Sequence, residues 1–286
     1  MDGQLSYAYA VVRPTAALER GTLQGLSGVG GAAGGPVRLV HAGEVAAVVS
    51  SVPEADFSEA ALKVRLEDLD WLEAVARAHH TVVESLTPHA TVLPLRLATV
   101  YLDDDRVRDT LRIGEAAFAR MLDRLADTVE WGVKVYAEVA DGSAGSSTGT
   151  STGTGTRAES PRDGPADESD PGRAYLRRRR QQHRARGAAW SAAAEAVRRI
   201  EAEAGELALE HARHRPQQGQ LAVGAGENVA NDSYLVPGRS SGEFQQRVLR
   251  AAEDLPGVRV EITGPWAPYS FAALAGPQVP EGVRQP

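Results

Sequence analysis

The sequence predicts an α+β protein of two domains, the C-terminal one a modified ferredoxin-like (βαββαβ) fold with a linker and a long-helix insertion. Two patterns of apolar residues and one shift in composition lead to this fold class. Short segments alternate apolar and polar residues as strands do, and longer segments repeat apolar residues every three or four positions as helices do. A run containing only Gly, Ser, Thr and Ala, residues 142–156, separates two sets of such segments.

The N-terminal domain is expected over residues 1–90. Tyr7, Tyr9 and Val11 alternate with small residues, which is typical of a strand. Ser58 is of the residue type that caps helices, and a proline ends the apolar stripe after it. The elements predicted in order are strands over 5–13, 37–41 and 44–52 and a helix over 58–87.

The ferredoxin-like domain is expected in two halves, residues 91–140 and 221–275. Its first strand is predicted over 91–101, where Pro94 favours a position at the edge of a sheet. The other predicted elements are a helix over 104–127, strands over 129–139 and 227–236, a helix over 241–254 and a strand over 258–263. Their order is strand, helix, strand, strand, helix, strand.

A linker over 141–171 and a long-helix insertion over 172–216 are expected between these halves. The linker has almost nothing apolar to bury, so we expect it to be disordered. A helix predicted over 188–212 carries apolar residues at alternating spacings of three and four, a seam that predicts lengthwise packing. The candidate seam residues are Trp190, Val197, Ile200 and Leu207. A loose tail is expected over 276–286.

Composition excludes several classes of protein. A net charge of −7 argues against general affinity for nucleic acid. The chain has no cysteine, which excludes disulfides, Cys-ligated metals and cysteine nucleophiles, and it fits a reducing compartment such as the cytoplasm. No stretch approaches the ~18 continuous apolar residues of a spanning helix, so no integral membrane association is expected.

An arginine-rich run lies at residues 173–186, which carry seven arginines and no acid. Such a run is able to bind RNA, an anionic lipid surface or an acidic partner. Tyr175 is the only aromatic residue in the run, so base stacking has little support. We interpret the run as an exposed helical face balanced by the acidic residues before it.

No motif in the sequence indicates an enzyme, a metal or a cofactor. The Gly-rich run 25–35 leads into a predicted strand and lacks the helix N-terminus that cradles a nucleotide phosphate. His79 falls in an apolar stripe and is interpreted as a packed histidine, while His211 and His214 are expected to be solvated. No nucleophile elbow, P-loop or triad spacing occurs.

The most distinctive segment is residues 263–271, with the sequence TGPWAPYSF. Gly and Pro end the preceding strand, and the aromatic rings offer rigid apolar area with polar groups at Trp and Tyr. Two interpretations stay open: a clasp that holds the chain end on the core, and a contact site for a partner. The candidate residues for either role are Pro265, Trp266, Pro268, Tyr269 and Phe271.

This segment resembles the TGPWPPYSF motif of the gas vesicle protein GvpF/GvpL family, from which it differs only at Ala267. The resemblance covers nearly all of the chain except 141–171, and it departs at Leu97-Ala98, where the family usually has Phe-Gly. The other similar stretches are YAYAVV (7–12), EVAAVVS (44–50), DLDWLEAVARAHHTVV (68–83), VLPLRLATVY (92–101), EWGVKVYAE (130–138) and SYLVP (233–237).

The resemblance implies a non-enzymatic accessory protein of gas vesicle formation, located at the gas vesicle in the cytoplasm. Its implied partners are the small hydrophobic shell protein, whose nucleation or assembly it would assist, and other gas vesicle accessory proteins. It also implies two α+β domains, one of them a modified ferredoxin-like fold. Contacts are expected from the helices over 58–87 and 188–212 and from residues 266–271. The alternative from the fold alone is a ferredoxin-like small-ligand-sensing regulatory protein.

Overall fold

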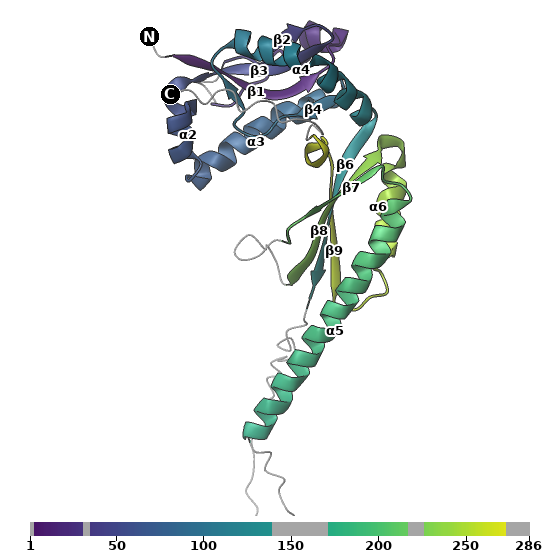
Figure 1. The fold of residues 1–286 in the computed structure, drawn as a ribbon. Coiled ribbons are helices and arrows are strands. Elements are labelled where there is room, and N and C mark those ends of the chain that lie inside the picture. The colour runs from purple at the N-terminus through teal and green to yellow at the C-terminus, as the bar shows by residue number, and fades with distance from the viewer. Residues whose placement is uncertain (1–2, 31–34, 139–170, 217–225, 273–286) are drawn as a thin grey trace, which may run out of the picture.

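Two antiparallel sheets with helices packed on them form the protein in a computed structural model that describes residues 3–30, 35–138, 171–216 and 226–272 (Figure 1). The predicted linker lies outside the described residues except for residue 171, and so does the predicted tail. Three short helical turns accompany the main elements: η1 (Leu18–Thr22), η4 (Gly238–Ser240) and η5 (Tyr269–Phe271).

The first sheet has the strand order β2-β3-β1-β4, and β5 also pairs with β1. Its strands are β1 (Gln4–Val12), β2 (Arg38–Ala42), β3 (Val45–Pro53), β4 (Val92–Pro94) and β5 (Val100–Tyr101). The three N-terminal strands are therefore confirmed. The strand predicted over 91–101 is two short strands, and its placement in the ferredoxin-like domain was wrong, because both pair with β1. Pro94 does lie in an edge strand, where a missing N–H costs no ladder bond.

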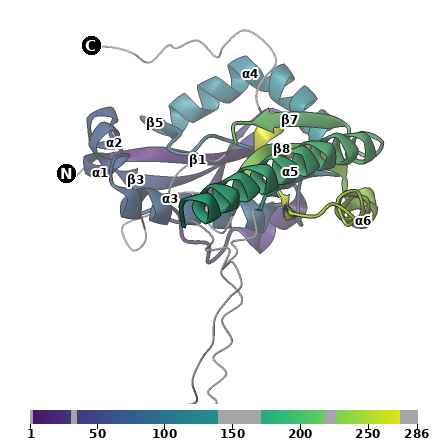
Figure 2. The ribbon, with the colours of Figure 1, turned by 90° about the horizontal axis from the view of Figure 1, so that it is seen from below.

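Strand β1 is buried on both faces because a helix covers each side of the first sheet. Helix α3 (Leu69–Leu86) lies on one side and α4 (Asp104–Leu125) on the other (Figure 2). Tyr7 and Tyr9 pack in the cluster with α3, whereas Ala8 and Val11 pack in the cluster with α4. The small residues that alternate with the tyrosines therefore face a helix, not solvent.

The helix predicted over 58–87 is interrupted at residues 66–68. Ser58 does cap a helix, α2 (Glu59–Arg65), by accepting a hydrogen bond from the Ala61 N–H at 3.4 Å. Asp68 caps α3 in the same way, accepting from the Trp71 N–H at 3.2 Å. The corner between the helices forms because a second capping residue competes with continuation of the helix. A single turn, α1 (Glu54–Phe57), precedes α2.

The second sheet has the strand order β7-β8-β6-β9, with every neighbouring pair antiparallel. Its elements follow each other as strand, helix, strand, strand, helix, strand. They are β6 (Thr128–Ala137), α5 (Pro171–Gly205), β7 (Glu210–His214), β8 (Glu227–Pro237), α6 (Ser241–Arg250) and β9 (Val258–Trp266). Both helices contribute to the apolar cluster on this sheet.

The predicted element order thus occurs, and its last three elements lie where the sequence predicted them. Its first three elements lie one strand and one helix later in the chain than the sequence suggested. Helix α4, predicted as the first helix of the second domain, covers the first sheet. Helix α5, predicted as an insertion, is the helix that connects β6 with β7. Apolar periodicity shows that a helix has a buried face but does not show which sheet covers that face, and this caused the error.

The buried seam of α5 is made mainly of alanines. Ile200 belongs to it at 2% exposure, but Trp190 is 37% exposed and Val197 is only partly buried. Leu207 lies beyond the end of the helix, and the predicted helix over 188–212 gives way to β7. The buried residues of α5, all in the apolar cluster on the second sheet, are Ala189, Ala193, Ala196, Ile200 and Ala204. Alanine is small and lets the helix approach the sheet closely. The buried face of α5 therefore consists of alanines and Ile200 instead of the larger residues that the sequence suggested.

Ala98 adopts a left-handed backbone conformation with φ of 59°. A side chain costs about 1–2 kcal/mol in this region, and part of that cost is offset because alanine has less unfolded-state freedom than glycine. We therefore expect Ala98→Gly to raise the free energy of unfolding by about 0.5–1 kcal/mol. Ala116→Gly, inside α4, is the control and should lower it by about 1 kcal/mol. Urea denaturation of both variants tests this, and a loss of stability in Ala98→Gly would contradict it.

Candidate functional site: the cleft between the two units

The chain passes between its two sheet units at two places. It leaves the first unit where α4 ends and β6 begins, through Asp127, whose φ is 56°. The Gly238 N–H donates to the Asp127 carbonyl oxygen at 2.8 Å and fixes this turn. The chain returns through residues 264–272, which begin in the last three residues of β9. Gly264 is needed there because a Cβ would lie 2.8 Å from the Glu130 carbonyl oxygen at a φ of 131°.

The returning segment is anchored in the core on both sides of the first sheet. Ala267 is 3% exposed and packs in the cluster with α3, and Phe271 is 5% exposed and packs in the cluster with α4 and Leu235. Between them, the Ser270 N–H and hydroxyl donate to the carboxylate of buried Glu130 at 2.8 and 2.6 Å. The segment therefore joins β6 of the second sheet to the helices of the first.

The two remaining aromatic residues of this segment lie against a histidine pair of α3. The Trp266 ring meets His80 edge-on, with centroids 5.1 Å apart. Tyr269 lies 6.2 Å from His79 and 6.3 Å from His80, centroid to centroid. Tyr269 is 36% exposed, so the segment keeps aromatic area at the surface while Phe271 is covered.

His79 is a packed histidine, as its place in the apolar stripe predicts, and it is 3% exposed. Its Nδ1 lies 2.9 Å from the Tyr7 hydroxyl, which also accepts from the Ala98 N–H at 3.1 Å. Because that hydroxyl has one hydrogen to donate, we assign Nδ1 as the acceptor and the ring as neutral. Burial lowers the pKa of His79 to about 4. This environment suits a neutral core histidine.

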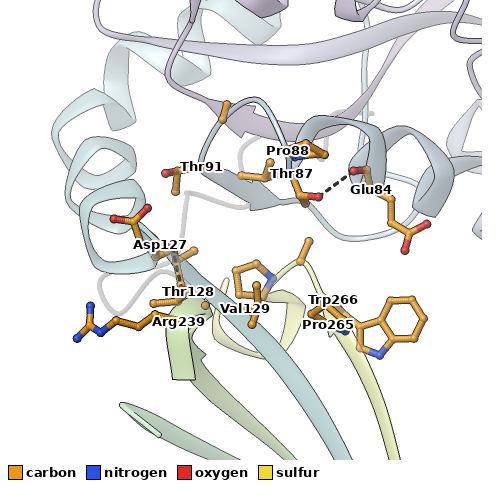
Figure 3. Close-up of a pocket in the computed structure, with 16 residues that line it drawn as sticks. Glu84, Thr87, Pro88, Thr91, Asp127, Thr128, Val129, Arg239, Pro265 and Trp266 are labelled. Atoms are coloured by element: carbon orange, nitrogen blue, oxygen red, sulfur yellow. Dashed lines mark hydrogen bonds between the residues drawn. The ribbon is translucent and has the colours of Figure 1, made fainter. Parts of the chain in front are cut away.

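A cleft of about 870 Å³ opens between the two units beside the returning segment (Figure 3). The end of α3 and residues 90–92 form one wall, and the start of β6 and residues 265–268 form the other. Its residues are Glu84, Thr87, Pro88, Ala90, Thr91, Val92, Leu125, Asp127, Thr128, Val129, Gly238, Arg239, Pro265, Trp266, Ala267 and Pro268. This volume falls within the range of about 300–1,000 Å³ typical of ligand pockets.

The walls of the cleft mix apolar and polar residues, and charged residues lie at its two ends. Asp127 and Arg239 lie at one end and Glu84 with Trp266 at the other (Figure 3). Neither Asp127 nor Arg239 forms an ion pair among the residues that the structure describes. The arrangement suits binding of an extended or helical apolar segment with polar flanks.

A serine and a histidine meet near the cleft without forming a catalytic triad. The His214 Nε2 lies 3.1 Å from the hydroxyls of both Ser233 and Ser270. The nearby acid, Glu130, accepts from Ser270 itself, and no described carboxylate pairs with the His214 ring. A triad needs its acid on the histidine. His214 and His211 lie in β7 with defined partners, and both are exposed, as the sequence predicts.

One group of described residues has the side chains of a metal site: Glu201, His211 and Asp232, with ligand atoms within 4.8 Å of one another. Arg213 already donates to Glu201 at 2.8 Å, and the His211 Nε2 lies 3.5 Å from Asp232. Arginine supplies the positive charge that a metal ion would supply. We therefore assign this group to an ion-pair network of β7, β8 and α5.

The Gly-rich run has a packing role in the part that the structure describes. The Val29 N–H donates to the Tyr9 hydroxyl at 2.7 Å. A Cβ on Gly28 would lie 2.4 Å from the Ser50 hydroxyl oxygen, so glycine permits the close approach of this loop to β3. The loop leads into strand β2 and not into the N-terminus of a helix, as the sequence predicts.

Taken together, two antiparallel sheets, a returning aromatic segment and an open cleft define a two-sheet α+β protein. No described helix combines the length and the apolar character needed to cross a membrane. The model of the family "Gas vesicle synthesis protein GvpL/GvpF" matches residues 5–273. The chain therefore belongs to the GvpL/GvpF family, which confirms the resemblance drawn from its motifs.

Individual relatives agree with this assignment. The chain is 45% identical over 279 residues to gas vesicle protein L of Streptomyces sp. (strain CB03234), covering 97% of this chain and 96% of the relative. The crystal structure of GvpF from Anabaena sp. PCC7120 is similar with a TM-score of 0.60 and 15% identity, covering 96% of this chain and 98% of that one. GvpF from Microcystis aeruginosa is similar with a TM-score of 0.59 and 16% identity, covering 94% and 99%. The two structures show a shared fold.

Proposed function

We propose that this chain is a non-enzymatic accessory protein of gas vesicle formation that binds the hydrophobic shell protein and assists its nucleation or assembly. Family membership over residues 5–273 is the observation that carries the proposal. Its direct partners are then the shell protein and other gas vesicle accessory proteins, and its location is the gas vesicle. An accessory protein of this kind would cover apolar shell-protein surface until polymerisation does so.

We further propose the interunit cleft as the contact site for an apolar segment of the shell protein. Trp266 is the anchor in this proposal, because tryptophan combines large contact area with a polar N–H and dominates many interfaces. Pro265 and Pro268 hold the backbone on either side of it stiff, so little entropy is lost on binding. The charges of Asp127, Arg239 and Glu84 would then flank the bound segment.

The domain division follows the two sheets in this proposal, with residues 3–125 in one unit and 128–266 in the other. We infer that the second unit is a modified ferredoxin-like domain. The order β6-α5-β7-β8-α6-β9 and the antiparallel sheet order β7-β8-β6-β9 support this inference.

Co-purification with the shell protein of the host tests the proposed function. Trp266→Ala should reduce capture of the shell protein at least about tenfold, as loss of a central aromatic anchor does. Trp190→Ala is the matched control, because Trp190 lies on α5 outside the cleft and hydrogen-bonds Glu227. This control should capture the shell protein like the wild type.

Two outcomes would count against the proposal in different ways. Equal capture by folded Trp266→Ala and wild type would remove the cleft as the contact site. No capture by folded wild-type protein would remove shell-protein binding itself. A saturable thermal shift with a small molecule would then favour the ligand-sensing alternative.

A further inference from the structure

The first half of α5 projects from the protein. Every side chain from Tyr175 to Ala188 is exposed, and Ala189 is the first buried residue among the described side chains of the helix. Figure 1 shows this half extending beyond the second sheet. At about 1.5 Å per residue, residues 171–188 span about 27 Å. We call residues 175–184 the arginine arm.

The arginine arm carries positive charge that no described residue neutralises. Its five arginines form no ion pair among the described residues, whereas Arg186, just beyond the arm, pairs with Glu227 at 2.7 Å. The arm also exposes apolar area, since Tyr175 is 61% and Leu176 52% exposed. Its arginines are Arg177, Arg178, Arg179, Arg180 and Arg184.

A surface of the opposite character lies at the corner between α2 and α3. Residues 64–70, which we call the acidic corner, expose Val64 by 70%, Leu66 by 45% and Leu69 by 77%. Its acids Glu67, Asp68 and Asp70 are exposed, and none of them forms an ion pair with a described residue. The basic residues around the corner are already engaged, in the pairs Lys63–Glu59, Arg65–Asp56 and Arg77–Glu73.

We propose that the arginine arm of one copy of this chain binds the acidic corner of a second copy. Within one molecule the two surfaces lie at opposite ends, so they cannot meet (Figure 1). Five of the eleven large hydrophobic residues exposed among the described residues lie in these two short segments. Joining them pairs charges of opposite sign that no described residue neutralises, and it covers apolar area at the same time.

The contact joins two different surfaces, so a pair of copies keeps one free arm, on one copy, and one free corner, on the other. Such a heterologous contact adds further copies head to tail instead of stopping at a pair. The arm is a helix with long side chains and no sheet behind it, so it can lie along a partner surface without displacing any contact of its own fold. The inference concerns the chain alone and does not rest on the proposed shell-protein contact.

A charge swap tests the proposal by sedimentation velocity of the full chain at low and high salt. The arm variant carries Arg177→Glu, Arg178→Glu and Arg180→Glu, and the corner variant carries Glu67→Lys and Asp70→Lys. Asp68 is left intact because it caps α3. Wild type should form concentration-dependent oligomers that weaken as NaCl increases, because exposed charges are screened. Each variant alone should associate at least about tenfold more weakly.

The mixture of the two variants gives the decisive result. The native acidic corner of the arm variant can meet the native arm of the corner variant, so an equimolar mixture should associate again. A control variant makes the same change in net charge as the arm variant, but at residues outside both surfaces. It carries Arg20→Glu, Arg96→Glu and Arg106→Glu, and it should associate like wild type. A monomeric wild type at low salt, an arm variant that associates normally, or a mixture that stays monomeric would each overturn the proposal. So would an arm that binds anionic lipid vesicles while the chain remains monomeric.

Discussion

Phe271→Ala should lower the free energy of unfolding by about 3–5 kcal/mol, the usual cost of truncating a buried phenylalanine. Phe271 is 5% exposed and packs with α4 of the first unit and Leu235 of the second. Truncation therefore opens a cavity where the two units meet, and the surrounding main chain is held by the Ser270–Glu130 hydrogen bonds and cannot collapse into it. Urea denaturation followed by circular dichroism measures the change.

Tyr269→Ala is the matched control for this prediction. Tyr269 lies two residues earlier in the same segment and is 36% exposed, so its truncation should cost less than half as much. A loss below about 1 kcal/mol for Phe271→Ala would mean that the segment does not hold the chain end on the core. Of the two interpretations that the sequence leaves open, only contact with a partner would then remain for these aromatics.

The stability of the protein should depend on pH through His79. Its pKa is about 4 in the folded protein and about 6.5 when unfolded. Between these values the unfolded chain binds one more proton, so stability falls as pH is lowered through the window from 6.5 to 4. The loss from this one group between pH 7 and pH 5 is about 2 kcal/mol.

The His79→Asn variant isolates this contribution. Asparagine places a carbonyl oxygen close to the position of Nδ1, where it can accept from the Tyr7 hydroxyl, but it does not titrate. Its urea midpoint should therefore change less between pH 7 and pH 5 than that of the wild type. His183→Asn, at an exposed site on α5, should keep the wild-type pH dependence. Equal pH dependence of His79→Asn and wild type would show that His79 is protonated without cost in the folded state.

Periodicity in the sequence predicted most elements but not their partners. The strands at β1, β2, β3, β6, β8 and β9 and the helices α4 and α6 follow clear apolar patterns. Strand β7 has the sequence EHARH, which is short and polar, so no alternation of apolar and polar residues predicted a strand there. The first half of α5 has no apolar seam, and no described residue covers it. A search of the sequence for buried helix faces does not detect such a helix.

The sequence predicted no cleft, but it singled out the residues of one of its walls. Pro265, Trp266 and Pro268 lie together in the sequence and were singled out as one segment. The opposite wall comes from the end of α3, residues 90–92 and the turn at Asp127, which are far apart in the chain and carry no shared motif. Their proximity depends on the placement of α4 on the first sheet, the step that periodicity did not resolve.

The double passage of the chain between its units limits how they can move. A single connecting peptide would permit rotation about several axes. Two covalent crossings, at residues 126–127 and at 264–272, favour rotation about the axis through both crossing points, and the packing of Phe271 between α4 and Leu235 opposes it. Both crossings contribute residues to the walls of the cleft. Rotation about that axis changes the width of the cleft without breaking either sheet, so a molecule held between the walls would restrict the principal degree of freedom left to the two units.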